Sequence, residues 1–551
     1  MKIGVVVWAE GLNVKFRINQ GAKVERGQLV KVYDGNIKYI LRVYNFRPES
    51  LLTPVEIARI SEKKSHGEDF ILYDKGLRLY DTAIATIVAQ VDEDGVARGP
   101  SSVPSLFTDV ETLDKIDLEQ LNLDTGDIML GYVRVGHKKS KSIVSLNGGE
   151  IIPHHILVSG VTGAGKSNLS KIIAYSIMRN EENNYSFIIF DCESEYFSGN
   201  APDKYGLAHL PEAEKKLFYV TSDVKEPSIL NYSFYYKGIR INRRIRSHPL
   251  EVSFSSLYPG DFTMTGEFSS PQEELLWLAR KEFGEDWLSI LLKSSPNFLY
   301  RRFNRMVHKN TINTIKRKLK YFLGNNDIFK EYVETDLLKA ILGAIGKGMV
   351  ILIDMPYASE GEEKLLTCTI ARRIFYTYEK LRKVALNEWV RLPYVLITVE
   401  EAHRYLSKSS LTNNGEIREN IFSIISKRGR KYRVGALYIT QMPGELIEPV
   451  VRQTLTKIIL PLPTKPDYMK VIQYSPYLDE AEQEIKTLDR GEALVVSPPS
   501  GLRFAVPVKI FCFEELVKDL LEEERLLLKS KRIEKKGAGK SRVAILDEFK
   551  K

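Results

Sequence analysis

The sequence predicts an α/β protein, with a parallel sheet covered by helices, a small antiparallel β-barrel before it and a mainly helical insertion within it. Three observations lead to this prediction. Short alternating strands fill the first hundred residues, apolar strands alternate with helices from about residue 150, and a mostly helical pattern runs from about 200 to 345. The length of 551 residues suits about three or four domains at ~150 residues each.

The first hundred residues contain strands in which polar and apolar residues alternate, at 14–18, 28–33 and 38–44. Turn signals rich in Asn, Asp and Gly separate them, at 19–21 and 34–36. Several short strands at this spacing predict a small antiparallel barrel.

The pattern changes after residue 150. We expect apolar strands at 156–159, 187–190, 349–353, 395–399, 436–439 and 458–460. Because helical stretches separate them, a parallel sheet with helices on its faces is predicted. The predicted domain ranges are 1–105 for the barrel, 106–150 for a linker and lead-in strands, 151–200 with 346–513 for the α/β core, 201–345 for the mainly helical insertion, and 514–551 for a C-terminal arm and basic tail.

The composition, 43% hydrophobic and 27% charged, is that of an ordinary globular protein. No apolar run approaches the ~18 residues needed to cross a bilayer, and the N-terminus turns polar too early for an export signal. The three cysteines, Cys192, Cys368 and Cys512, lie far apart, which argues against a disulfide framework and a Cys-rich zinc site. A cytoplasmic protein without a membrane partner is therefore expected.

The net charge is +9, and many of the basic residues cluster in four basic islands. Residues 301–320 hold eight Lys or Arg and no acid, and residues 236–246 and 421–440 hold five each and no acid. Residues 529–542 hold seven against one acid. Two interpretations stay open: a polyanionic partner such as nucleic acid, or solvated helix faces.

One motif carries a specific chemistry. The stretch 160–167 reads Gly-Val-Thr-Gly-Ala-Gly-Lys-Ser, follows an apolar strand and opens a helix, which is the context that a phosphate-binding loop requires. Backbone N–H groups would cradle phosphates, the lysine would reach the β- and γ-phosphates, and the serine would bind Mg²⁺. ATP and Mg²⁺ are thus the expected cofactors, bound by Gly160, Gly163, Ala164, Gly165, Lys166, Ser167 and Asn168. A similar stretch at 537–541 lacks a preceding strand and is interpreted as a flexible tail.

Three predicted strands end in an acid, and only one supplies two adjacent carboxylates, Glu400 and Glu401. A nucleotide hydrolase needs one acid near Mg²⁺ and a second one that orients or deprotonates water. We assign Glu400 to the Mg²⁺ shell, through water, and Glu401 as the catalytic base. Asp354 has a simpler interpretation as a cap of the next turn, and for Asp191 and Glu195 an approach to the nucleotide stays open.

The next strand ends in Gln441, which is expected to sense the γ-phosphate, with an amide that satisfies a loop as the alternative. Between these strands lies a basic run. Ring ATPases place an arginine at a subunit edge, where it stabilises charge on the neighbour's γ-phosphate. Arg430 is the first candidate and Arg428 the second, and a surface charge run is the alternative.

These motifs together resemble the HerA family, archaeal hexameric DNA translocases and helicases among the FtsK-like ATPases. The resemblance rests on the N-terminal barrel and on residues 155–168, 400–404, 429–432 and 439–441, and it covers the whole chain in order. The phosphate loop alone is not specific to the family, whereas Glu-Glu-Ala-His and Gly-Arg-Lys at this spacing are much more so. The core is accordingly expected to be a RecA-like P-loop ATPase.

The resemblance implies a homohexameric ring with duplex DNA, bound without sequence preference, in its channel. It also implies a NurA-type nuclease as a partner and a link to end resection beside the Mre11–Rad50 complex. Arg430 would then act in trans on a neighbouring subunit, and the C-terminal arm would lie across a neighbour. The turn at Ser500 and Gly501 would lie close to the nucleotide.

Two rival functions remain at this stage. A VirB4-like protein-secretion ATPase would share the core but need a membrane apparatus. A nucleotide-gated clamp would hold DNA and activate a nuclease without translocating, so its activity would survive loss of the base Glu401.

Overall fold

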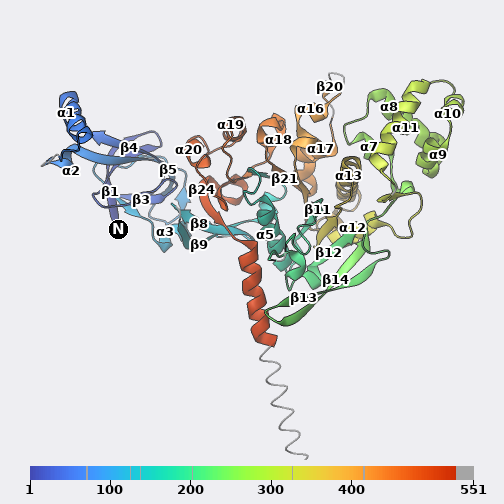
Figure 1. The fold of residues 1–551 in the computed structure, drawn as a ribbon, viewed down its shortest axis with the longest axis horizontal. Helices are drawn as coiled ribbons and strands as arrows, with labels where there is room; N and C mark the ends of the chain where they lie inside the picture. Colours follow the sequence, from blue (N-terminus) through green and yellow to red (C-terminus); the bar gives the residue numbers. More distant parts are fainter. Residues whose placement is uncertain are drawn as a thin grey trace, which may run out of the picture. The chain divides into compact units, whose positions relative to one another are not determined.

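The computed structural model describes residues 1–69, 72, 74–124, 126–136, 138–201, 203–325, 327–413, 416–417 and 419–528 (Figure 1). The basic island at 529–542 and the rest of the predicted tail lie outside the described residues. The chain divides into two units. The first comprises Met1–Lys166 and Thr440–Ile510, and the second comprises Ser167–Ile439 and the chain from Phe511 onward.

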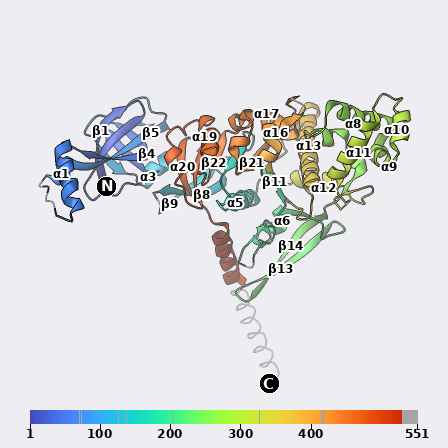
Figure 2. The ribbon, with the colours of Figure 1, turned by 45° about the horizontal axis from the view of Figure 1, so that its top comes forward.

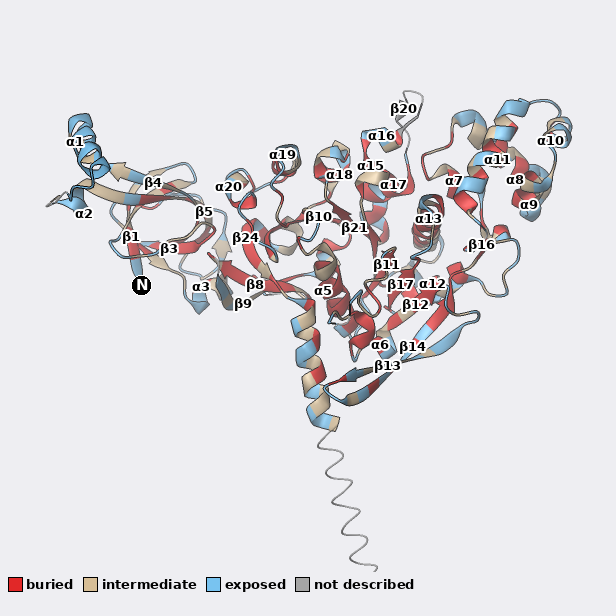
Figure 3. Cartoon of the chain, viewed as in Figure 1, coloured by how far each residue is buried: buried red, intermediate tan, exposed pale blue. Residues whose placement is uncertain are grey.

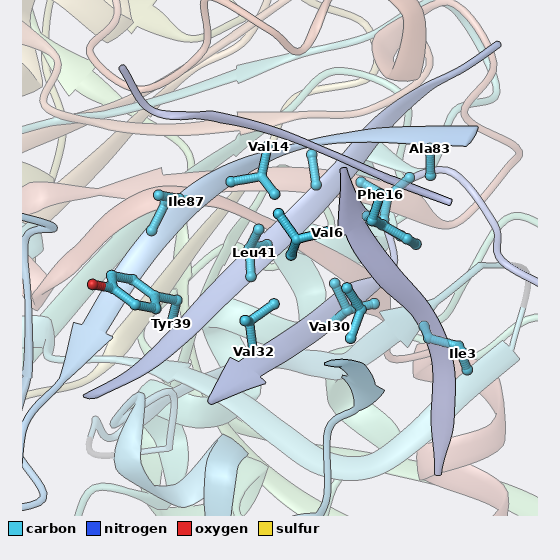
Figure 4. Packing of buried hydrophobic residues seen from close by; sticks show 13 residues of the cluster. Ile3, Val6, Val14, Phe16, Val30, Val32, Tyr39, Leu41, Ala83 and Ile87 are labelled. Carbon is cyan, nitrogen blue, oxygen red and sulfur yellow. The ribbon is translucent and has the colours of Figure 1, made fainter. Parts of the chain in front are cut away.

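The first unit begins with a closed barrel of six strands. Its strands are β1 (Lys2–Glu10), β2 (Asn13–Ile18), β3 (Leu29–Asp34), β4 (Ile37–Ser50), β5 (Leu79–Val91) and β7 (Asp109–Thr112), with β6 (Ala97–Arg98) added to the edge of β5. All neighbours are antiparallel, and the pairing of β2 with β5 closes the ring. Alternate side chains fill the interior, among them Val6, Val14, Phe16 and Leu41 (Figure 4). The predicted barrel is confirmed.

The barrel extends beyond residue 105, where the sequence predicted its end. The last strand, β7, pairs with β1 and β3 and completes the ring. Its four residues, Asp-Val-Glu-Thr, contain one buried apolar side chain, Val110, so they show no alternation that a pattern search could detect.

The rest of the first unit is a sheet in the order β10-β22-β23-β24-β8-β9. Its strands are β10 (Ile156–Ser159), β22 (Thr456–Ile459), β23 (Glu492–Ser497), β24 (Leu502–Ile510), β8 (Ile128–Val135) and β9 (Lys138–Leu146). Only β10 and β22 are parallel. The short helices of this region are α3 (Lys115–Gln120), α4 (Gly148–Ile151), α18 (Glu448–Gln453), α19 (Lys465–Gln473) and α20 (Glu482–Ile485).

A buried charge cluster ties the barrel to this sheet. Arg42 of β4 donates to Glu484 of α20 at 2.6 Å, and Arg134 of β8 bonds the same carboxylate. All three side chains are at most 5% exposed. Because a buried carboxylate between two arginines is costly to leave unpaired, the cluster fixes the barrel's position within the unit.

The second unit carries a sheet in the order β13-β14-β12-β17-β11-β18-β21. Its strands are β13 (Ser228–Tyr236), β14 (Ile239–Pro249), β12 (Leu217–Thr221), β17 (Val350–Asp354), β11 (Tyr185–Asp191), β18 (Tyr394–Val399) and β21 (Val434–Thr440). All are parallel from β14 to β21, and only β13 is antiparallel. Every residue of β11, β17 and β21 is buried (Figure 3), as the apolar runs predicted for a sheet covered on both faces. The α/β core of the fold prediction is confirmed.

The longer helices of this sheet are α5 (Lys166–Arg179), α13 (Glu360–Val384) and α17 (Ile421–Arg428), with the short α6 (Ala213–Lys216), α14 (Leu386–Trp389), α15 (His403–Leu406) and α16 (Lys408–Leu411). A capping box begins α13: Ser359 accepts from the backbone N–H of Glu362, whose side chain accepts from the N–H of Ser359.

The range 201–345 differs in part from the helical insertion that was expected. Its first part forms β12, β13 and β14, which extend the sheet, and β15 (Val252–Ser253) pairs with β16 (Phe329–Lys330). Because Arg240, Arg244 and Arg246 occupy exposed positions of β14 and Arg243 lies close by, that strand reads as a basic run in the sequence. The helices follow as α7 (Pro259–Thr263), α8 (Ser270–Phe283), α9 (Trp287–Lys293), α10 (Pro296–Arg302), α11 (Lys309–Leu323) and α12 (Leu337–Ile345). Figures 1 and 2 show α8 to α11 gathered in one group beside α13.

The described part of the C-terminal arm is a helix over residues 513–528. It lies beside the β13–β14 hairpin of the same chain, where Arg243 makes two hydrogen bonds to Glu524 at 2.9 and 2.6 Å. Among the helices in the described ranges, none combines the length and the apolar character needed to span a membrane.

Candidate nucleotide-binding site

The phosphate loop connects β10 to α5 and belongs to the first unit. Gly163 and Gly165 have φ angles of +76° and +109°, which L side chains rarely adopt, and no atom lies within 4 Å of a Cβ built on either residue. The space beside both glycines is therefore open to a ligand. Gly160 is required for a different reason, because a Cβ there would lie 2.8 Å from the Cβ of Leu460.

Lys166 closes the loop on itself. Its ammonium donates to the carbonyl oxygens of Gly160 and Val161 at 3.0 and 3.1 Å. These contacts hold a positive charge at the loop, where the N-terminus of α5 adds the positive end of its dipole. Both features favour a phosphate.

Gln441, predicted to act as a sensor, reaches the phosphate loop. The hydroxyl of Thr162 donates to the amide oxygen of Gln441 at 2.6 Å. The carbonyl oxygen of the preceding residue, Thr440, accepts from the backbone N–H of Gly160. Thr162 was not singled out from the sequence, because it occupies a variable position of the loop motif. The two chain segments of the first unit therefore meet at the phosphate loop.

Asn168, which was predicted to bind the nucleotide, uses its side chain to hold the start of the C-terminal arm. It donates to the carbonyl of Phe511 and accepts from the N–H of Phe513, both at 2.8 Å. The loop motif gives no signal for this second role.

Ser500 and Gly501 form the turn between β23 and β24, where the Ser500 hydroxyl accepts from the N–H of Asn147 at 2.8 Å and Gly501 has a φ of +82°. In the first unit this turn lines a cavity of about 980 Å³ together with barrel residues, among them Leu12 and Arg98. No lining residue of this cavity comes from the phosphate loop, so these contacts do not bring Ser500 and Gly501 together with the loop.

The predicted acids belong to the second unit. Glu400 follows β18 and is half-buried, and the hydroxyl of Tyr196 donates to its carboxylate at 2.7 Å. Burial raises the pKa of Glu400 to about 7; the bond from Tyr196 opposes that rise, and the negative charges of Glu195, Asp191 and Glu401 add to it. This carboxyl is therefore poised between its protonated and ionised forms near neutral pH.

Asp191 shapes the turn that carries Tyr196. Its carboxylate accepts from the backbone N–H groups of Glu193, Glu195 and Tyr196 at 3.2, 3.2 and 2.9 Å. Burial raises the pKa of Asp191 to about 6, although these three bonds favour its charge. Asp191 thus acts on the turn, and the turn places the tyrosine on Glu400.

Asp354 is bound within the same region. Its carboxylate accepts from the hydroxyls of Ser194 and Tyr219, at 2.7 and 2.6 Å. Since both carboxylate oxygens have a partner in the chain, the contacts agree with the structural interpretation of this residue. Tyr196, Ser194 and Tyr219 were missed in the sequence because they lie outside any motif.

Glu401 adopts a left-handed backbone with a φ of +44°. Its Oε2 lies 3.4 Å from Nδ1 of His403, and its side chain is 32% exposed. A non-glycine residue in this conformation stores strain, which structures tend to tolerate at functional positions. The two adjacent half-buried glutamates therefore differ in their surroundings, because Glu400 accepts a hydrogen bond from Tyr196 and Glu401 lies in a strained turn beside His403.

The two candidate arginines also differ. Arg428, at the end of α17, pairs with Glu379 of α13. Arg430 follows in the 3₁₀ turn Gly429–Tyr432 and is exposed, and its side chain has no ion-pair or hydrogen-bond partner in the part of the chain that the structure describes. Arg428 is thus engaged within its own chain, whereas Arg430 is available to another molecule.

The donor set fits a magnesium ion that arrives with a nucleotide. Ser167 and Glu400 present hard oxygen atoms, which Mg²⁺ prefers, and Mg²⁺ needs only one or two protein ligands beside phosphate and water. Over the described ranges, no group of three His, Cys, Asp or Glu side chains is placed to hold a metal ion. An all-protein metal cage is therefore not indicated there.

Comparisons with known proteins agree with these features. The profile of the family "Helicase HerA, central domain" matches residues 128–374. The "DNA double-strand break repair helicase HerA" of Pyrococcus furiosus is 24% identical over 535 residues, which cover 91% of this chain and 90% of that protein. The protein of the same name from Sulfolobus acidocaldarius is 24% identical over 527 residues, covering 93% and 94%.

Among solved structures, the plasmid coupling protein TrwB in complex with a non-hydrolysable GTP analogue has a TM-score of 0.41 and 13% identity, and the alignment covers 67% of this chain and 88% of that one. The family profile and the relatives that align along nine-tenths of the chain confirm the resemblance predicted from the motifs. The chain is thus similar to proteins named HerA along about nine-tenths of its length.

Proposed function

We propose that this protein is an ATP-dependent DNA helicase or translocase that acts in DNA repair. The observation that carries the proposal is the pair of unlike glutamates after β18 in a chain that also bears a complete phosphate loop. Relatives that align along nine-tenths of the chain are named DNA double-strand break repair helicases, which supports DNA as the substrate.

The phosphate loop binds the nucleotide in this proposal. The N–H groups of residues 160–165 and the ammonium of Lys166 hold the β- and γ-phosphates. Ser167 and Glu400 hold Mg²⁺, which when bound neutralises charge on the phosphates. Tyr196 orients the carboxylate of Glu400 through its hydrogen bond.

Glu401 takes the proton of the attacking water. Gln441, held by Thr162, senses the γ-phosphate, and Arg430 stabilises the charge that develops there.

The finer steps follow from the same proposal. Arg430 has no partner among the described residues of its own chain, which supports action in trans within a homohexameric ring. Duplex DNA is the cargo, gripped through its phosphates without sequence preference. A NurA-type nuclease and the Mre11–Rad50 complex are the proposed partners, in end resection, and the proposed compartment is the cytoplasm.

The test is the ATP hydrolysis rate of the full chain with and without duplex DNA, read together with the mass of the assembled particle. We expect DNA to stimulate hydrolysis in a particle of six chains. Lys166→Ala should abolish both hydrolysis and strand displacement or translocation, because the ammonium is lost from the loop. Displacement that survives this change would contradict the motor.

The same assay separates the rival functions. A clamp would activate a nuclease equally well with Glu401→Gln, whereas a motor would not. An ATPase that duplex DNA leaves unchanged would favour the secretion motor.

A further inference from the structure

The β13–β14 hairpin presents two unlike faces. On one face lie the cross-strand pairs Ile229–Arg246, Asn231–Arg244, Ser233–Asn242 and Tyr235–Arg240, and all eight residues are exposed. Between residues 227 and 250 there is no Asp or Glu. One side of the hairpin is thus a row of arginine and polar side chains without an acid of its own.

The opposite face holds the hairpin in place. Tyr232 and Phe234 pack edge-on against His209, and Tyr236 donates to the carbonyl of Lys518 in the C-terminal helix at 3.3 Å. Arg243 forms its two bonds to Glu524 from this side, and Lys237 pairs with Glu522 at 2.9 Å. Two of the five cations in this basic island, Arg243 and Lys237, therefore pair with carboxylates of the C-terminal helix, and three do not.

The three remaining cations, Arg240, Arg244 and Arg246, have no carboxylate partner within ion-pair distance in the chain as described. Arg240 donates to the hydroxyl of Ser233 at 3.2 Å, and Arg246 lies 3.8 Å from the sulfur of Met349. The carboxylate of Glu214 accepts from the backbone N–H of Arg244 at 3.2 Å. Their charges are accordingly available to an external anion.

The other described basic island outside the ATPase motifs is organised differently. In residues 301–320, Lys316 and Lys318 donate to the carbonyls of Ser294 and Glu267, and Arg302 pairs with Glu282. Several cations there are therefore used to pack helices against each other. The hairpin, by contrast, places three arginines without a carboxylate partner among the described residues in one row on its exposed face.

We propose that the face of β13–β14 bearing Arg240, Arg244 and Arg246 binds the phosphate backbone of duplex DNA. Alternate residues of a strand lie about 7 Å apart, so the row spans about 20 Å, or about six base-pair steps at 3.4 Å each. A two-stranded ribbon also matches the width of the major groove. Asn231, Asn242 and Tyr235 supply donors beside the arginines. This assignment rests on the proposed function, whose substrate it contacts.

The experiment measures duplex DNA binding by the full chain over a series of salt concentrations. The variant replaces Arg240, Arg244 and Arg246 by Gln together. Because each phosphate contact contributes about 0.9 to the slope of log K against log salt, we expect the slope to fall by about 3 and the affinity at 0.1 M salt to fall about tenfold or more. ATP hydrolysis without DNA and the particle mass should not change.

Two matched variants complete the test. Arg→Lys at the same three positions should restore most of the slope, since charge is retained. Arg301, Arg305 and Arg317, which are exposed in the other island, are replaced by Gln as a control of equal charge and should leave the slope near the wild-type value.

The outcomes separate this inference from the proposed function. If wild-type protein binds duplex DNA and the hairpin variant keeps its slope, the hairpin assignment is wrong and the proposed function stands. An equal loss in the control also overturns the assignment, as does dissociation of the particle, which would make the face a contact between copies. If wild-type protein does not bind duplex DNA, both proposals fail.

Discussion

The phosphate loop and the acid cluster hold their charged groups in opposite ways. The loop relies on backbone geometry, with two glycines at positive φ, open space beside them and one lysine bonded to carbonyls of its own loop. The cluster relies on burial, with Glu400 against Tyr196 and with Asp191 and Asp354 satisfied by the surrounding turns. A local motif thus suffices to bind phosphate, whereas tuning a carboxylate requires the tertiary fold.

The largest effect is expected at Glu401, the second member of the acid pair. Glu401→Gln removes the proposed base, and general bases contribute about 10²- to 10⁴-fold, so ATP turnover should fall by at least about 100-fold while nucleotide binding persists. Single-turnover hydrolysis and nucleotide affinity are the measurements. Glu193→Gln, which removes an exposed carboxylate nearby, is the matched control and should remain active. Full turnover in the Glu401 variant would refute its role as base.

Backbone geometry is tested next, at Gly165. Alanine there keeps the rest of the loop sequence intact, but a side chain at a φ of +109° costs about 1–2 kcal/mol of backbone strain. Nucleotide affinity should therefore fall about 5- to 30-fold. Gly491→Ala introduces a similar strain, at a φ of +76° with open space beside it, outside the loop. This control should lose stability without losing affinity. An unchanged affinity in Gly165→Ala would show that the loop does not depend on this conformation.

Tyr196→Phe tests the tuning of Glu400. The change removes the hydrogen bond that opposes the effect of burial, so the pKa of Glu400 should rise further above about 7 and less of the carboxylate will be ionised at neutral pH. We expect a loss of several-fold in turnover at pH 7 that is recovered at higher pH. The control is Tyr219→Phe, which removes the comparable bond to Asp354 and should leave the pH profile in place. Identical profiles for wild type and Tyr196→Phe would contradict this role.

The smallest expected effect is on stability in metal-free buffer. The folded state holds the proton of Glu400 up to about pH 7, whereas the unfolded chain releases it near 4.5, so its stabilising contribution is present below pH 4.5 and is lost as the pH rises toward 7. The Tm should therefore decrease by a few degrees over this window. Glu400→Gln should remove that part of the decrease, and a slope that is the same in both proteins would show that burial does not hold the proton.

Much of the fold was predictable because its signals are local. Alternation identified the barrel strands, and fully apolar runs identified the strands of the parallel sheet. The end of the barrel was not predictable, since β7 is short and mostly polar. The strand β14 was hidden as well, because its exposed arginines alternate with buried isoleucines in a run that also reads as a charged surface.

By itself, the sequence determined the phosphate loop, the positions of the apolar strands along the chain and the acids that follow three of them, because each depends on neighbouring residues or on a fixed spacing. Only the tertiary structure decided what these groups meet. It brought Thr162 to Gln441, 279 residues away, and Tyr196 to Glu400, 204 residues away, and it paired Arg428 with Glu379 while leaving Arg430 exposed. The physical reason is that burial and hydrogen-bond partners are properties of a packed site, to which distant segments contribute side chains that no local pattern marks.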